Sequence, residues 1–215
     1  MIKSVITDGR KLKKRTMETN WKEKNKEIRE AIIDVKDTMR SLNINALSAP
    51  QIGYDLRFFC LKFGKGDIRT FINPIITGVK GLQLSEEYCS SLPDKKYLRI
   101  RNNDINITYL NPMGNVESKQ LVGLAAIKFQ HQMEHLEGIT DAELGLEIDK
   151  DYDDATDDEK AKIVEMYLES LDLKAKTLDA AIEKDDNAKS LKQAIEFSQA
   201  AMKGEIEFEH DENNE

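Results

Sequence analysis

Residues 121–137 read as a helix that carries two histidines, His131 and His135, four positions apart. Apolar residues recur there at helical spacing, and Gly138 fits the left-handed position that closes a helix. Residues four apart share one helix face, so both imidazoles can reach the same metal ion. This pair alone is weak support for a metal site, because the spacing often arises by chance. A third ligand must come from elsewhere.

The chain before this helix is patterned as a set of short strands. Residues 57–63 and 70–76 read as two strands, the second ended or bent by Pro74. Residues 104–118 read as two more strands around a turn at 111–114. An amphipathic helix is predicted over residues 20–42, and Asn20 with Glu23 forms a capping box at its start.

Charge divides the chain in two. Residues 149–215 contain 21 acidic and 9 basic side chains, whereas residues 1–148 contain 19 acidic and 23 basic ones. We therefore predict a domain at 1–147, an acidic helical hairpin at 148–204 and a disordered acidic tail at 205–215. The hairpin should begin with a capping box at Thr156 and Glu159, run to about Glu183, break over residues 183–190 and end at Met202.

The acidic hairpin is interpreted as a packing appendage or a surface for self-association. Its charge argues against strong direct binding to nucleic acid, whose phosphate backbone attracts basic surfaces. No apolar run approaches the ~20 residues of a membrane span, and the N-terminal sequence lacks the features of an export signal. We expect a cytoplasmic protein that does not associate with membranes.

Of the two cysteines, Cys60 reads as a small buried residue within a strand. Cys89 falls in a loop-like polar segment and is the candidate third ligand. One cysteine with two histidines leaves a fourth position open, as in catalytic zinc sites. A purely structural zinc site is a weaker alternative, because such sites normally have four protein ligands.

Three segments together resemble the signature motifs of the peptide deformylases. "INALSAPQ" at 44–51 resembles G-x-G-x-A-A-x-Q, "EYCSS" at 87–91 resembles E-G-C-L-S, and "QHQMEHLEG" at 130–138 resembles Q-H-E-x-D-H-L-x-G. The order and spacing are those of the family, and the resemblance covers about residues 1–145. It implies an α+β fold, in which mixed, mainly antiparallel strands surround a central metal-binding helix.

The resemblance also implies an activity, a metal and partners. Peptide deformylases are hydrolases that remove the formyl group from N-formylmethionine of nascent polypeptides, which makes an N-formylmethionyl peptide and the ribosome the expected partners. One divalent ion is expected, Fe(II) in the cell, with zinc or nickel as substitutes. The positions that match its ligands are Cys89, His131 and His135.

Other site residues follow from the same motifs. Gln51 matches a glutamine that helps to hold the formyl oxygen or the attacking water, and the backbone N–H of Ser90 matches a donor to the developing oxyanion. Arg101 should pair with Glu134 and keep the helix and the cysteine segment in register around the metal. The positions expected to contact substrate are Ile44, Ala46, Glu87, Leu124 and Ile127.

Four positions depart from the motifs. Ile44, Ala46 and Tyr88 replace glycines, and Gln132 replaces the glutamate that transfers the proton from water to the leaving amine. A primary amide has no accessible pKa for this step, and general acid–base catalysis typically contributes about 10²–10⁴-fold, or about 3–5 kcal/mol. We therefore expect strongly reduced turnover. The alternative is a non-catalytic module that binds formyl-Met peptides or a partner protein on the same fold.

Overall fold

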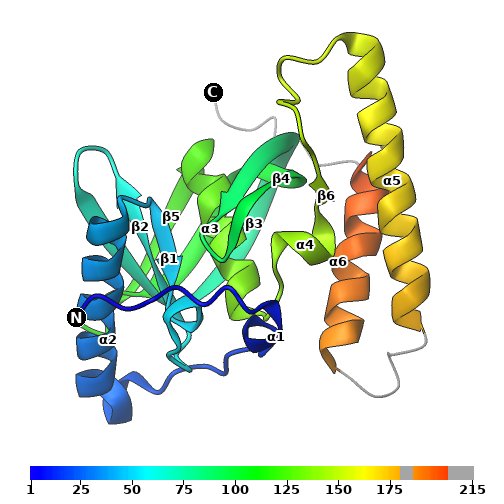
Figure 1. Ribbon diagram of the computed structural model, residues 1–215. Coiled ribbons are helices and arrows are strands. Elements are labelled where there is room, and N and C mark those ends of the chain that lie inside the picture. Colours follow the sequence, from blue (N-terminus) through cyan, green and yellow to red (C-terminus); the bar gives the residue numbers. More distant parts are fainter. Residues whose placement is uncertain (180–185, 203–215) are drawn as a thin grey trace, which may run out of the picture.

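The computed structural model describes residues 1–179 and 186–202, and Figure 1 shows the arrangement of the elements. The predicted disordered tail at 205–215, like the predicted helix end near Glu183, lies outside the described residues.

A six-stranded antiparallel sheet forms the centre of the fold. Five strands follow one another across the sheet in chain order, and a short sixth strand pairs with the fourth. Because every pairing is antiparallel, short turns suffice to join the second strand to the third, the third to the fourth and the fourth to the fifth. The strands are β1 (Ala46–Ser48), β2 (Phe58–Phe63), β3 (Asp67–Cys89), β4 (Leu92–Leu110), β5 (Val116–Val122) and β6 (Leu146–Glu147).

Strands β3 and β4 are much longer than the short strands predicted from the sequence. Pro74 bends β3 without ending it, since the pairing register shifts between Ile72 and Ile75 and then continues to the hairpin turn. Cys89 is the last residue of β3, so the expectation of a loop-like position was wrong. The turn predicted at 111–114 is confirmed, with β4 and β5 on either side.

The predicted N-terminal helix is confirmed as α2 (Trp21–Leu42). The side chain of Asn20 accepts hydrogen bonds from the backbone N–H groups of Lys22 and Glu23, as an N-cap should. The apolar face of α2 packs into a core cluster with β1 and β2. Two short helices, α1 (Gly9–Leu12) and the 3₁₀ helix η1 (Pro50–Ile52), lie on either side of it in the chain.

The histidine-bearing helix is α3 (Leu124–Leu136), which starts later than predicted. Leu121, placed in the helix by its apolar pattern, belongs to β5 and pairs with Ile105 of β4. The helix crosses the sheet (Figure 1). Phe129 of this helix packs edge-on against Phe59 and Phe71. Helix α3 is therefore seated on the aromatic core, and Gly138, with φ of 74°, follows its end as predicted.

The C-terminal part forms the predicted pair of helices, which lie side by side at one end of the molecule (Figure 1). These are α5 (Asp157–Asp179) and α6 (Asp186–Met202), preceded by the short helix α4 (Asp141–Leu144). The Thr156–Glu159 capping box is present. The break predicted over residues 183–190 is too long, because residues from 186 onward are already helical.

The helical pair is joined to the sheet by a buried apolar cluster, whose fully buried members include Leu98 of β4 and Leu171 of α5. Tyr167 of α5 is also buried there, and its hydroxyl donates to the carbonyl of Leu144 at 2.8 Å. The two helices thus share a core with the sheet.

Among the described residues, none of the helices has the length and apolar character that crossing a membrane requires.

Candidate metal centre

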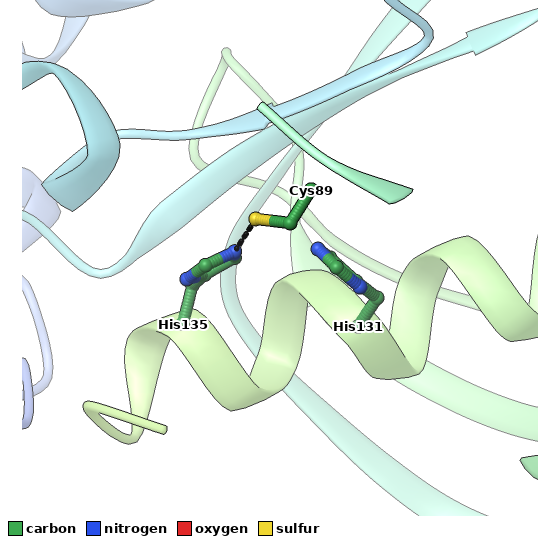
Figure 2. Close-up of side chains that lie close together, drawn as sticks. All are labelled: Cys89, His131 and His135. Atoms are coloured by element: carbon green, nitrogen blue, oxygen red, sulfur yellow. Dashed lines mark hydrogen bonds between the residues drawn. The ribbon is translucent and has the colours of Figure 1, made fainter. Parts of the chain in front are cut away.

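Cys89, His131 and His135 converge where the end of β3 meets α3 (Figure 2). All three are buried, and their potential ligand atoms lie within 4.8 Å of one another. The Sγ atom of Cys89 is 3.2 Å from Nε2 of His135. The three side chains can therefore face a single ion, in agreement with the sequence prediction that these residues would meet.

Glu87 fixes the orientation of the His131 ring. Its Oε2 lies 2.8 Å from Nδ1 of His131, while Arg101 donates to the same carboxylate from Nε at 2.6 Å and from Nη2 at 2.9 Å. When Nδ1 donates its proton to Glu87, the lone pair on Nε2 is left for a metal. Such a carboxylate behind a ligating histidine is a common arrangement in metal sites.

The expected ion pair between Arg101 and Glu134 is present at 2.6 Å, within a larger buried network. Arg99 also binds Glu134 through two guanidinium nitrogens, at 2.6 and 2.9 Å, and it pairs with Asp141 of α4 at 2.6 Å. Arg99 and Asp141 were not among the residues predicted from the sequence. The alternation of a strand could have found Arg99, which lies two residues from Arg101 and so on the same face. Asp141 is brought in by tertiary packing.

Burial and neighbouring charges shift the pKa values of the two histidines in opposite directions. Burial, assisted by the nearby His131, lowers the pKa of His135 to about 3. Burial also opposes protonation of His131, but Asp141, Cys89 and Glu87 outweigh it and raise the pKa of His131 well above its ordinary value. His135 is thus uncharged and can offer a nitrogen lone pair to a metal ion. The surroundings of His131, in contrast, favour a positive charge at its ring.

These residues fit a divalent transition metal. One thiol and two imidazoles suit zinc or iron, and three protein ligands leave a position for substrate. His131, Glu87 and Asp141 form a second group of close donor atoms. There, however, arginines already bind both carboxylates, so that group serves as a hydrogen-bonding support behind His131.

Gln51 lies at the same centre, after strand β1. Its Oε1 accepts from the backbone N–H and the hydroxyl of Ser48, which fixes the carboxamide plane. Its Nε2 then points at the β3–β4 turn, 3.8 Å from Sγ of Cys89, 3.4 Å from Oγ of Ser90 and 3.1 Å from Oγ of Ser91. A fixed amide donor therefore lies next to the candidate ligand.

A cavity of about 490 Å³ opens beside these residues. The five positions expected to contact substrate, Ile44, Ala46, Glu87, Leu124 and Ile127, all line it, together with Gln51, Cys89, Ser90 and His131. His135, Arg101 and Glu134 are not among the residues that line the cavity.

The cavity wall also includes the three residues that replace motif glycines, which are Ile44, Ala46 and Tyr88. None of them has a positive φ. They reshape the cavity without straining its backbone.

Gln132 lines the cavity on the same face of α3 as His131. Its side chain is buried, and within residues 1–179 and 186–202 its Oε1 has no hydrogen-bond partner. An unpaired buried carbonyl is costly unless a ligand or water completes it. The position expected to hold a proton-transferring carboxylate therefore holds a neutral amide that faces the cavity.

Both the sequence and the fold of this chain are similar to those of known proteins. A sequence profile of the family described as polypeptide deformylase matches residues 2–143. A peptide deformylase of Psychrobacter cryohalolentis is 34% identical over 128 residues, which cover 58% of this chain and 70% of the relative. One of Fusobacterium nucleatum is 34% identical over 129 residues, covering 60% and 74%. The crystal structure of peptide deformylase from Thermotoga maritima matches with a TM-score of 0.61 and 29% identity, over 65% of this chain and 95% of that one.

Proposed function

Since this chain belongs to the peptide deformylase family, we propose that it acts on the N-formylmethionine of nascent polypeptides, as a metal-dependent hydrolase whose turnover is strongly reduced by Gln132. The observation that carries the proposal is the cavity in which Cys89 and His131 lie beside Gln132. In the proposed domain organisation, residues 1–147 form the catalytic domain and residues 148–204 form a helical extension. The substrate implies action near the ribosome in the cytoplasm.

The proposed ligands are Cys89, His131 and His135, with Fe(II) as the expected ion and zinc or nickel as substitutes. A divalent ion at this position would act as a Lewis acid toward the formyl carbonyl and would lower the pKa of a water molecule. The protein's own contribution is to hold the three donor atoms within 4.8 Å of one another and to orient His131 through Glu87.

Two groups on the cavity wall are proposed to hold the formyl group. The Nε2 of Gln51 is a donor aimed at the Cys89 end of the cavity, and its orientation is fixed by Ser48. The backbone N–H of Ser90 is proposed as a second donor to the oxygen that gains negative charge. Prepositioned donors of this kind stabilise an oxyanion without reorganising during the reaction.

Gln132 can hydrogen-bond to a bound ligand, but it cannot accept and return a proton at neutral pH. The neighbouring acids do not replace it. Burial opposes the ionisation of Glu134, but Arg101 and Arg99 outweigh it and lower its pKa to about 2, so this carboxylate is a weak base. Glu87 is likewise paired with Arg101 and has a lowered pKa. We therefore propose binding that is largely retained and turnover that is slow.

A second candidate function is a binding module that recognises formyl-Met peptides or a partner protein without cleavage. The neutral Gln132 favours it, as do the larger side chains of Ile44, Ala46 and Tyr88 at the cavity. In this alternative the acidic hairpin is the surface for a partner or for self-association.

The test is formate release from formyl-Met-Ala-Ser by anaerobically purified, iron-loaded protein, compared with the Gln132→Glu variant. We expect the variant to be about 10²–10⁴-fold faster, which is the usual contribution of a general base. Gln193→Glu makes the same chemical change at an exposed position on α6 and should leave the rate unchanged. A parent chain that already turns over as fast as Gln132→Glu would contradict the proposed role. If neither chain releases formate while both bind the peptide, the binding module becomes the better description.

A further inference from the structure

One face of α3 forms a wall of the cavity. Leu124, Ile127, Lys128, His131 and Gln132 all line it, and their spacing of three and four residues places them on a single helix face. Lys128 lies one turn before Gln132 and three residues before His131. The side chain of Lys128 therefore lines the same cavity wall as His131.

The charges on the cavity wall are paired, with one exception. Glu86 pairs with Lys96 at 3.3 Å, and Glu87 pairs with Arg101 at 2.6 Å. Lys128 has no carboxylate partner within 4.0 Å among the residues that the structure describes. Since Gln132 is neutral, the wall combines the ammonium group of Lys128 with two carboxylates that are each already paired with a basic side chain.

The neighbours of Lys128 limit what it can bind. Leu124 lies one turn before Lys128, and Ile127 directly precedes it; both are apolar and line the cavity, so they can contact a short aliphatic chain. The ammonium group of Lys128 is a point charge with three donors, and its flexible stem lets it meet an anion at the end of such a chain. The wall is thus suited to an aliphatic stem with a negatively charged tip.

From this arrangement we propose that Lys128 is a specificity-determining residue, and that the cavity prefers N-formyl ligands with a carboxylate near the formyl group over neutral ones. The proposal rests on the proposed function of the site and names its ligand class. The carboxylate can come from the first side chain, as in a formyl-glutamyl peptide, or from the C-terminus of a formyl dipeptide. Both sources supply the same partner to Lys128.

The test compares the dissociation constants of four ligands for the full-length, zinc-loaded protein by titration calorimetry at low salt. Formyl-Glu-Ala-amide and formyl-Gln-Ala-amide have nearly the same shape and differ in charge. Formyl-Met-Ala as the free acid and as the amide form a second pair, with the charge at the C-terminus. We expect the acidic member of at least one pair to bind about tenfold more tightly, as one partly exposed charge pair can provide.

Two lysine variants locate the effect. Lys128→Met keeps the length and helix propensity of the side chain, and it should remove most of the advantage of the acidic ligand. Lys65→Met makes the same change on the exposed β2–β3 turn and should retain that advantage. The advantage should also shrink as salt increases, because salt screens exposed charges.

The outcomes separate this inference from the proposed function. Equal affinity for acidic and neutral ligands, or an advantage that survives in Lys128→Met, overturns the role of Lys128 and leaves the proposed function intact. If none of the four formyl ligands binds, the proposed function itself fails. The pair that shows the difference identifies the source of the carboxylate.

Discussion

Oε2 of Glu87 lies 2.8 Å from Nδ1 of His131, with Arg101 bound to the same carboxylate from the other side. The ring of His131 is therefore oriented by a buried ion pair, and Arg101 extends the contact to Glu134 on α3. Removing Arg101 would leave the buried carboxylate of Glu87 without its arginine partner, which is strongly unfavourable. The geometry of the candidate metal centre thus depends on residues that do not line the metal position themselves.

Glu87→Gln should weaken metal binding, because a neutral amide holds the His131 ring less firmly and withdraws a negative charge from behind it. Loss of such a supporting carboxylate typically costs about 10–100-fold in metal affinity. Zinc affinity measured by competition with a chelating dye checks this. The neighbouring Glu86→Gln is the matched control, since Glu86 pairs with Lys96 and should leave the affinity unchanged. Equal affinities for both variants would remove Glu87 from this role.

Zinc should raise the melting temperature of the protein, and this gain should depend on Cys89. Binding to the folded state alone adds about 2.7 kcal/mol of stability when the free metal is at 100 times its dissociation constant. Cys89→Ser should lose most of the gain. Cys60 is the second cysteine and is also buried, but its sulfur contacts the hydroxyl of Thr70. Cys60→Ser can lower the melting temperature by itself, yet it should retain the gain on adding zinc.

The metal-free protein should lose stability in acid partly through Glu134. Burial opposes the ionisation of Glu134, but Arg101 and Arg99 lower its pKa from 4.5 to about 2. A carboxylate with a lowered folded-state pKa stabilises the fold above its unfolded-state pKa, and this contribution is lost as the pH falls from 4.5 toward 2. In urea unfolding across this range, Glu134→Gln should show a slope shallower by about 1.4 kcal/mol per pH unit. Identical slopes would mean that this ion pair does not form in solution.

The helical extension should contribute to the stability of the whole chain through Leu171. This side chain is fully buried in the cluster that joins α5 to the sheet, so Leu171→Ala should cost about 2–4 kcal/mol of unfolding free energy. Leu173→Ala is the matched control on the same helix, because Leu173 is 69% exposed, and it should change stability by less than about 0.5 kcal/mol. Chemical denaturation measures both. Equal effects would argue against the packing of α5 on the sheet.

Local signals were sufficient to predict several elements. Asn20 marks the start of α2 because its side chain satisfies the free N–H groups of the first turn. The turn between β4 and β5 was likewise predicted from its own residues. The start of α3 was missed because Leu121 and Val122 fit both a strand and a helix, and only their pairing with β4 decides between them.

Features that depend on distant contacts were not predictable in the same way. The position of Cys89 at a strand end follows from the long β3–β4 pairing, whose irregular pattern of polar and apolar residues hides its length. Asp141 meets Arg99 because α4 packs against β4, a tertiary contact that local periodicity does not encode. The convergence of Cys89, His131 and His135 was expected from the family motifs. The burial of all three around one point comes from the structure.

In the proposed site, the residue that sets the reaction rate is separate from the residues that hold the ion. Gln132 faces the cavity, whereas Glu87, Arg101 and Glu134 hold the metal-binding helix and the end of β3 in place. Glutamine and glutamate codons differ by one nucleotide. If the proposed role of position 132 holds, a single point mutation there would connect a binding form and a hydrolytic form of the same fold, and a lineage could exchange one for the other without rebuilding its metal centre.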